Sequence, residues 1–379
     1  MVAIPTALLA SSIISSIPNV GPLNAAVRYF GNAVRQFESP PIVSRSDPAS
    51  YFATVLGPVI DLNFPDPTII HVDGTSYAFA TNNRGVGGKL IHVQMATSTD
   101  NETWTYLHGQ DALPDVAAWA TGGRVWAPDI VQVVRAEIGF EGCQKLTADQ
   151  DDGSFVMYYA DEIAGNPAHH CVGVATSQTI LGPYKPQDTP FACPIDQGGA
   201  IDADGFQDVD GKRYVVYKVD GNSIGHGGEC MNSVAPIVPT PIMLQEVAED
   251  GVTLIGKPTE VLDRDDFDGP LIEAPSLHRS DEGIYFLFFS SNCFSGPLYD
   301  TSYATATSIY GPYTKAERPL FITGDGPDLR GPGGSDIVKD GSRVVLHGHL
   351  DGTTGYVGYT PRGMYTALLK FNGRTVTAQ

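Results

Sequence analysis

The chain has 379 residues, with 23 Lys and Arg against 43 Asp and Glu, so its formal net charge is −20. A surface this acidic repels phosphate backbones and excludes nucleic acid as an expected partner. Hydrophobic residues make up 42% of the chain, yet beyond the N-terminus no apolar run is long enough to span a membrane. The 42 Gly and 28 Pro are scattered along the chain, which is typical of many short strands joined by tight turns.

The N-terminal segment differs from the rest. Residues 3–17 are apolar and Ser-rich and are stopped by Pro18, which resembles the apolar core of a signal peptide, although the basic start is missing. We interpret 1–26 as a signal peptide, 27–58 as an N-terminal arm and 59–379 as the folded domain of a secreted protein. The alternative is that the whole segment is a disordered or packed arm.

A short signal then recurs five times. An acidic residue followed by Gly precedes an apolar, β-branched and aromatic run, at intervals of about 60 to 80 residues. Each pair indicates a hairpin turn before a buried strand. The five pairs are Asp73-Gly74, Asp152-Gly153, Asp210-Gly211, Glu282-Gly283 and Asp340-Gly341.

A second recurrence completes the unit. Ala-Thr-Ser at 96–98, 175–177 and 306–308 leads in each case to an aromatic residue, namely Trp104, Tyr184 and Tyr313. These segments predict a third strand, a short loop and an outer strand. Five repeats of four strands predict an all-β fold, a five-bladed β-propeller. A β-sandwich would not show this period.

The strand before each hairpin turn carries a carboxylate near its start. The five are Asp66, Asp129, Asp202, Glu273 and Asp336. Because the first strand of each blade lines the axis, we expect these side chains to converge at one mouth of the channel. One such Asp would be a turn or cap residue, but five in equivalent positions indicate a site. Two interpretations stay open, alone or together: a cation on the axis, or acid–base catalysis by paired carboxylates.

The ordered motifs FPDP, VWAPD, AIDADGFQDVDG, IEAP and GPGG…LHG, between about residues 63 and 350, resemble glycoside hydrolase family 43. The resemblance implies a five-bladed propeller and an inverting glycosidase, acting as a monomer on plant cell-wall arabinan or arabinoxylan. The Asp in VWAPD favours release of α-L-arabinofuranosyl units. A β-xylosidase and an endo-arabinanase of the same family remain alternatives.

The resemblance also implies three catalytic roles. Asp66 matches the general base that activates water, and Glu273 matches the general acid that protonates the leaving oxygen. Asp202 matches the third carboxylate, which orients the acid and tunes its pKa. One carboxyl group must stay protonated near neutral pH, and a neighbouring negative charge helps to keep it so.

Four further residues are assigned with the same resemblance. Trp126 is expected to be a platform for sugar stacking, with Asp129 as a sugar contact or a structural acid. Arg330 is the nearest candidate for the late arginine that contacts sugar. His347 matches the histidine that reaches a Ca²⁺ or a water cluster on the axis, and His349, on the same side of the strand, is an alternative to it.

No other cofactor is expected, because no phosphate-binding Gly-rich loop opens a helix. Where relatives carry Gly-Pro-Gly-His, this chain has Gly at position 334, so the role of that histidine is lost.

Two other classes of protein compete with this interpretation. Retaining, invertase-like propellers carry Asn-Asp-Pro-Asn-Gly and Glu-Cys-Pro, whereas this chain has Phe64-Pro65-Asp66-Pro67 and Glu273-Ala274-Pro275. A non-catalytic sugar-binding propeller would not need an acid on each inner strand.

The five cysteines lie far apart and contain no CxxC pair. Cys230 and Cys293 both follow the second strand of adjacent blades in Gly-rich loops, so we predict a disulfide between them. Cys171 with Cys193 is the second predicted pair, which leaves Cys143 free.

Overall fold

The computed structural model describes residues 54–84, 88–133, 154–326, 328–350 and 360–379. The predicted signal peptide, nearly all of the predicted arm, and Cys143 lie outside these residues. Within them no helix is long and apolar enough to cross a membrane.

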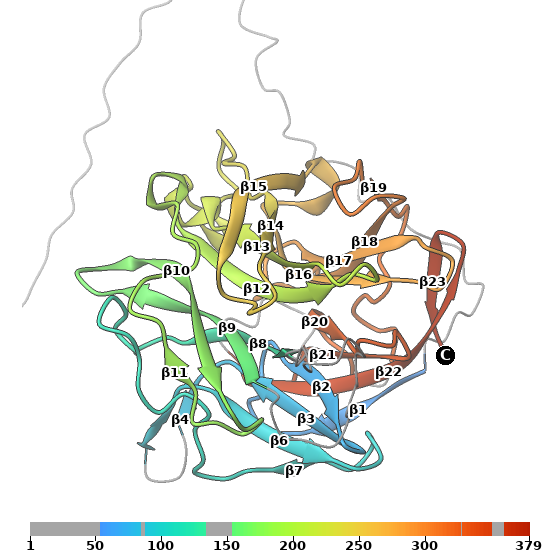
Figure 1. The fold of residues 1–379 in the computed structure, drawn as a ribbon. Coiled ribbons are helices and arrows are strands. Elements are labelled where there is room, and N and C mark those ends of the chain that lie inside the picture. Colours follow the sequence, from blue (N-terminus) through green and yellow to red (C-terminus); the bar gives the residue numbers. More distant parts are fainter. Residues whose placement is uncertain (1–53, 85–87, 134–153, 327, 351–359) are drawn as a thin grey trace, which may run out of the picture. The chain divides into compact units, whose positions relative to one another are not determined.

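Five antiparallel sheets of the described chain are the blades of a propeller (Figure 1). In the first four blades the strands run from the axis outward in chain order. Blade 1 contains β2 (Thr68–Val72), β3 (Thr75–Ala80), β6 (Gln94–Ser98) and β7 (Thr105–Tyr106), and blade 2 contains β8 (Trp126–Val133), β9 (Ser154–Ile163), β10 (Asn166–Ser177) and β11 (Lys185–Pro186). Blade 3 contains β12 (Ala200–Gln207), β13 (Arg213–Val219), β14 (Ile242–Val247) and β15 (Leu254–Leu262), and blade 4 contains β16 (Ile272–Arg279), β17 (Tyr285–Ser291), β18 (Asp300–Ala306) and β19 (Thr314–Lys315).

Blade 5 joins the two ends of the described chain. Its strands β20 (Gly333–Ile337), β21 (Arg343–His349) and β22 (Arg362–Asn372) come last in the sequence, but the outer strand is β1 (Val55–Ile60). β23 (Thr375–Ala378) also pairs with β22. The propeller therefore starts at β1, four residues before the boundary expected at residue 59, because the first strand completes the last blade.

Short elements fill the connections. β4 (Asn83–Arg84) pairs with β5 (Leu90–Ile91), and the 3₁₀ turns with described bounds include η2 (Ile195–Gln197), η3 (Gly221–Ile224), η4 (Glu229–Met231) and η5 (Asp266–Asp268).

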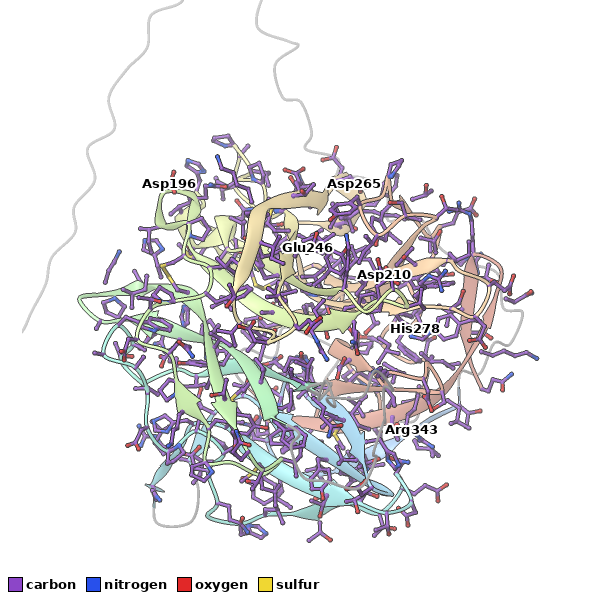
Figure 2. The ribbon with its side chains drawn as sticks, in the orientation of Figure 1. Asp196, Asp210, Glu246, Asp265, His278 and Arg343 are labelled. Carbon is purple, nitrogen blue, oxygen red and sulfur yellow. A yellow bond between two sulfur atoms is a disulfide. The ribbon has the colours of Figure 1, made fainter. Side chains whose placement is uncertain are left out.

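Local sequence signals explain the hairpins. Four of the five acidic-Gly pairs lie between the first and second strands of a blade, and the pair at 152–153 lies outside the described residues. Gly74, Gly211 and Gly341 have φ of 76°, 88° and 75°, in the left-handed region that favours glycine. Asp210, labelled in Figure 2, marks the turn between β12 and β13.

The core is divided among the blades. Each of the five apolar clusters is shared by two neighbouring blades; one of them, for example, brings Phe286 and Phe288 of blade 4 against Val344 and Leu346 of blade 5. At the centre, β2, β8, β12, β16 and β20 contact one another in a closed ring. This ring places the starts of all five inner strands around one axis.

Candidate active site

The inner strands share a backbone irregularity where the carboxylates lie. In four of them the strand register shifts over a two-residue interval, and the bulged residue in that interval has a positive φ. Blade 1 has the same conformation just before β2. The five residues and their φ values are Asp66 (53°), Ala127 (40°), Asp202 (57°), Ala274 (50°) and Gly334 (54°). Such bulges redirect side chains and are frequent beside active sites.

The bulges place the carboxylates at two levels, which corrects the expectation that all five are equivalent. Asp66 and Asp202 share the positive-φ conformation at the mouth, and Glu273 directly precedes the bulged residue Ala274. Two residues after each bulge comes a lower ring, formed by Thr68, Asp129, Asp204, Ser276 and Asp336. A cavity at the axis is lined by both levels except Glu273, whose neighbour Ala274 lines it.

The lower ring is a buried hydrogen-bond network. The Thr68 hydroxyl lies 2.9 Å from Asp129 Oδ1 and 2.7 Å from Asp336 Oδ2, and Ser276 donates to Asp336 over 3.0 Å. A hydroxyl has only one proton to donate, so one of the two carboxyl groups beside Thr68 must itself carry a proton. Burial, followed by mutual charge repulsion, accordingly raises the pKa of Asp129 and of Asp204.

Asp129 therefore has the contacts of a structural acid. It is buried, and its second oxygen accepts a hydrogen bond from the Gly205 backbone N–H over 2.8 Å. Of its two expected roles, the hydrogen bonds favour the structural one over the sugar contact.

Asp66 is surrounded by groups that favour its ionised form. Arg362 Nη1 lies 3.0 Å from Asp66 Oδ1, the Thr81 hydroxyl donates to Oδ2 over 2.7 Å, and His347 Nδ1 lies 3.2 Å from Oδ1. Burial alone would raise the pKa of Asp66, but Arg362, His347 and Thr81 together lower it well below its ordinary value. Asp66 is therefore held as a carboxylate, the form that a general base requires.

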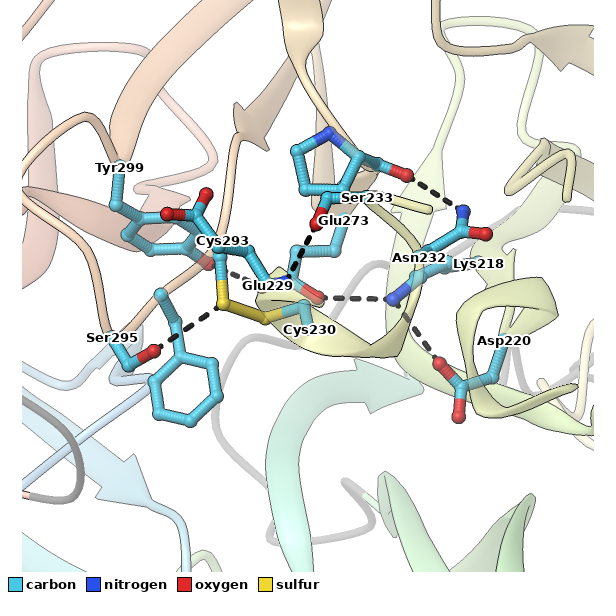
Figure 3. The surroundings of a disulfide bond; sticks show 12 residues. Lys218, Asp220, Glu229, Cys230, Asn232, Ser233, Glu273, Cys293, Ser295 and Tyr299 are labelled. Atoms are coloured by element: carbon cyan, nitrogen blue, oxygen red, sulfur yellow. Dashed lines mark hydrogen bonds and ion pairs between the residues drawn. A yellow bond between two sulfur atoms is a disulfide. The ribbon is translucent and has the colours of Figure 1, made fainter. Parts of the chain in front are cut away.

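Glu273 is held at both oxygens. Lys218 Nζ lies 3.0 Å from Oε2, and the Tyr299 hydroxyl donates to Oε1 over 2.9 Å (Figure 3). Lys218 also lies 3.2 Å from Asp220 and has no exposed side-chain surface. These contacts fix the Glu273 carboxyl group at the start of β16.

Asp202 lies beside Glu273. Its Oδ2 accepts a hydrogen bond from the Ala274 N–H over 2.9 Å, and Ala274 follows Glu273 directly. Burial and then the charge of Glu273 raise the pKa of Asp202, while Lys218 opposes the rise. The pKa of Asp202 is thus shifted in the direction opposite to that of Asp66.

The arginine at the mouth is Arg362, which the sequence did not single out. It begins β22, contacts Asp66 and lies over the Phe294 ring at 5.1 Å. The expected residue, Arg330, instead donates to the Leu329 carbonyl over 3.0 Å, and the described residues show no hydrogen bond or ion pair between it and the three mouth carboxylates.

Trp126 lies at the mouth as the first residue of β8. It is half-buried, and its ring stacks on His170 with 3.8 Å between centroids and 19° between planes. His170 supports one face of the indole ring. The other expected feature of a sugar platform, contact with sugar, stays a prediction.

The surroundings of His347 do not fit a calcium ion. The ring is fully buried, and its Nε2 lies 3.3 Å from the Arg362 guanidinium, whose charge repels a cation. His349 has both ring nitrogens within hydrogen-bond distance of protein atoms, Thr360 Oγ1 and the Phe294 carbonyl. Among the described residues no group of three His, Cys, Asp or Glu side chains is arranged to hold a metal ion.

Both predicted disulfides are present. Cys230 pairs with Cys293, and Cys171 pairs with Cys193, with Cα separations of 5.5 and 4.7 Å. The Cys230–Cys293 bond joins η4 of blade 3 to the loop after β17 of blade 4, and Glu273 is among the residues that surround it (Figure 3).

The fold and the site together define a five-bladed propeller whose axial mouth carries three carboxyl groups, namely Asp66 beside Arg362 and the neighbouring Asp202 and Glu273. The family model of glycosyl hydrolases family 43 matches residues 55–372. The chain belongs to this family, which confirms the resemblance noted in its motifs.

Individual relatives are distant. An extracellular endo-α-(1→5)-L-arabinanase 2 from Bacillus subtilis (strain 168) is 24% identical over 292 residues, which is 73% of this chain and 54% of the relative. A β-D-galactofuranosidase, xynD, from Aspergillus niger is 26% identical over 258 residues, 67% of this chain and 64% of the relative. The chain thus spans between about half and two thirds of the length of these curated relatives.

Solved structures confirm the fold. A thermostable family-43 glycoside hydrolase aligns with a TM-score of 0.64 and 23% identity, covering 84% of this chain and 93% of the other. The native arabinanase of Bacillus subtilis aligns with a TM-score of 0.54 and 22% identity, covering 83% and 97%.

Proposed function

We propose that the protein is an inverting glycoside hydrolase that releases α-L-arabinofuranosyl units from arabinan or arabinoxylan. The observation that carries this proposal is the opposed electrostatics of the mouth carboxylates. Arg362 keeps Asp66 ionised, while Asp202 and Glu273 crowd each other. Pairs of titratable groups whose surroundings push their pKa values apart are suited to acid and base roles.

The mechanism follows from these roles. Asp66 removes a proton from water as the water oxygen attacks the anomeric carbon. Glu273 gives its proton to the glycosidic oxygen as the bond from carbon to that oxygen breaks, and an inverted sugar and a free alcohol result.

Arabinose specificity and secretion are supported by two further observations. A relative is named as an extracellular arabinanase. Two disulfides agree with an oxidising compartment.

The substrate is tested by product release from linear arabinan, arabinoxylan and the aryl α-L-arabinofuranoside, β-D-xylopyranoside and β-D-galactofuranoside. We expect the arabinofuranoside to be the preferred aryl substrate. Preference for the xyloside or the galactofuranoside would replace the proposed arabinose specificity by specificity for that sugar. Sugar binding without product from any substrate would favour a non-catalytic propeller.

The catalytic roles are tested by two substitutions. Asp66→Ala should lose activity on every substrate, because water must always be deprotonated. Glu273→Ala should lose roughly 10²–10⁴-fold on natural glycosides and much less on aryl glycosides, whose phenolate leaves without a proton. Asp210→Ala, in an exposed turn of blade 3, is the matched control and should retain activity. NMR at early times should show the inverted anomer; a retained anomer would recast Asp66 as a nucleophile.

A further inference from the structure

Lys218 is the one described lysine whose side chain is completely buried at the mouth. It lies near the end of β13, in the apolar run YVVYKV, where a lysine is rarely tolerated unless it is paired. Its ammonium group lies 3.0 Å from Glu273 Oε2 and 3.2 Å from Asp220 Oδ1. Burial disfavours its charge, but the carboxylates of Glu273, Asp220 and Asp202 outweigh burial and raise the pKa of Lys218.

We propose that Lys218 is a positioning residue of the general acid: it orients Glu273 and sets the pH above which the acid is no longer protonated. The inference rests on the proposed function, because it assigns Lys218 a part in the same proton transfer. Lys218 stabilises the Glu273 carboxylate that remains once the proton has gone to the leaving oxygen. A positive charge at this distance favours the ionised form of a carboxyl group and so favours release of its proton.

Four other groups face this pair. Tyr299 donates to Oε1 of Glu273 and is neutral, since burial and the charge of Glu273 raise its pKa. Asp202 on β12 opposes Lys218, because its negative charge favours the protonated acid. Asp220 partly neutralises Lys218, and Asp66, across the mouth, is balanced by Arg362. The working range of the acid is thus a balance between Lys218 on one side and Asp202 with Asp220 on the other.

The balance predicts shifts of opposite sign. Lys218→Met removes the positive charge, so the alkaline limb of the pH profile of kcat/KM on a natural glycoside should move up by about one pH unit or more, given the effect of a charge within 4–6 Å. Asp202→Asn and Asp220→Asn should move the limb down. On an aryl glycoside with a good leaving group, Lys218→Met should change kcat little. A merely structural defect would instead lower the activity on the natural and the aryl glycoside alike.

The matched control is Lys212→Met. Lys212 lies in the same blade and pairs with Glu246 over 3.7 Å, but it is 53% exposed and lies in the turn before β13. Loss of the Lys212 charge should leave the alkaline limb of the pH profile unchanged. If Lys218→Met does not fold, as judged by circular dichroism, Asp220→Asn still tests the sign.

Two outcomes would overturn the inference while the proposed function stands. One is an active, folded Lys218→Met enzyme whose alkaline limb is unmoved or lowered. The other is an Asp220→Asn enzyme whose limb rises. Absence of glycosidase activity in the unmodified protein would instead refute the proposed function itself.

Discussion

Gly334 shows how closely the residues of the mouth are packed. It is a bulged residue with φ of 54°, and a Cβ there would lie 2.7 Å from His347 Nδ1 and 2.9 Å from Asp66 Oδ1. Contacts this short require His347 or Asp66 to move. The histidine that relatives carry at this position cannot be accommodated by the present arrangement of Asp66 and His347.

Gly334→Ala should therefore reduce activity on all substrates by displacing the base. Gly74→Ala is a matched control, because Gly74 has φ of 76° but nothing within 4 Å of an added Cβ. Both changes introduce the strain of a positive φ, which is of order 1 kcal/mol, and only the first displaces catalytic groups. Equal activity in the two variants, measured on an aryl arabinofuranoside, would contradict this account.

Arg362 beside His347 leads to a prediction about metal. Since the guanidinium already supplies a positive charge to Asp66, a cation near His347 is not required to keep the base ionised. Activity should survive dialysis against a chelator and should not rise when Ca²⁺ is restored. A loss of activity that only Ca²⁺ reverses would show that the axis holds a functional ion after all.

The residues that sequence analysis found and missed differ in kind. Asp66, Asp202 and Glu273 lie in short local motifs, so they could be found without knowledge of the fold. Arg362 reaches Asp66 across 296 residues of sequence, and no local motif marks such a contact. Lys218 did leave a signal, a lysine within an apolar strand, and that signal predicts a buried partner of opposite charge.

At the scale of elements, the hairpins and the strand order were predictable because turn chemistry is local. The acidic-Gly turns are formed by adjacent residues. Their regular spacing marks a repeat, and their number gives the number of blades. The bulges were not predictable. They depend on the backbone φ of residues such as Ala127 and Ala274, which carry no sequence preference for that conformation. For this reason the five carboxylates, which were expected at one level of the axial channel, lie at two levels, the mouth and the lower ring.

The disulfide between Cys230 and Cys293 closes a loop of 63 residues between two blades. In the chain-entropy model such a loop contributes up to about 4 kcal/mol to the free energy of unfolding. The double variant Cys230→Ala/Cys293→Ala should therefore unfold at a lower temperature than the unmodified protein. Non-reduced peptide maps of the unmodified protein should show no alkylated Cys230.

Cys171→Ala/Cys193→Ala is the comparison, with a separation of 22 residues and a smaller expected loss. That bond lies within a single blade, between β10 and the segment before η2. Greater destabilisation from loss of this second bond would contradict the expected dependence on loop length.

At the scale of the whole molecule, closure was the feature that sequence could not supply. Pairing of β1 with β22 joins residues about 300 positions apart, and nothing in the run VLGPVI indicates its partner. The lower ring is a second consequence of closure, because five inner strands converge only once the circle is complete. The acids of that ring make the stability of the entire propeller depend on pH.

The sign of this dependence follows from the buried acids. Asp204 has its pKa raised in the folded protein by burial and by Asp129 and Asp336. A raised pKa gives stability that is fully present below the unfolded value, near 3.9, and is lost as pH rises through the folded value. Asp204 therefore contributes more to the free energy of unfolding at pH 5 than at pH 8, whereas the buried His170, His278 and His347, whose pKa values are lowered, oppose it over the same range. Asp66, whose pKa is lowered, works in the opposite direction only at pH values below this range.

Asp204→Asn separates the effect of the buried lower ring on stability from the effect of the net charge of −20. The amide oxygen can still accept from the Leu277 N–H, so the hydrogen bond of 3.0 Å is kept while the charge is removed. We expect this variant to be more stable than the unmodified protein at pH 8, by a margin that fades toward pH 4. Asp210→Asn also removes one negative charge, but from an exposed turn, and should change the melting temperature little at either pH. If both variants shift it equally, the net charge and not the buried ring governs the pH dependence of stability.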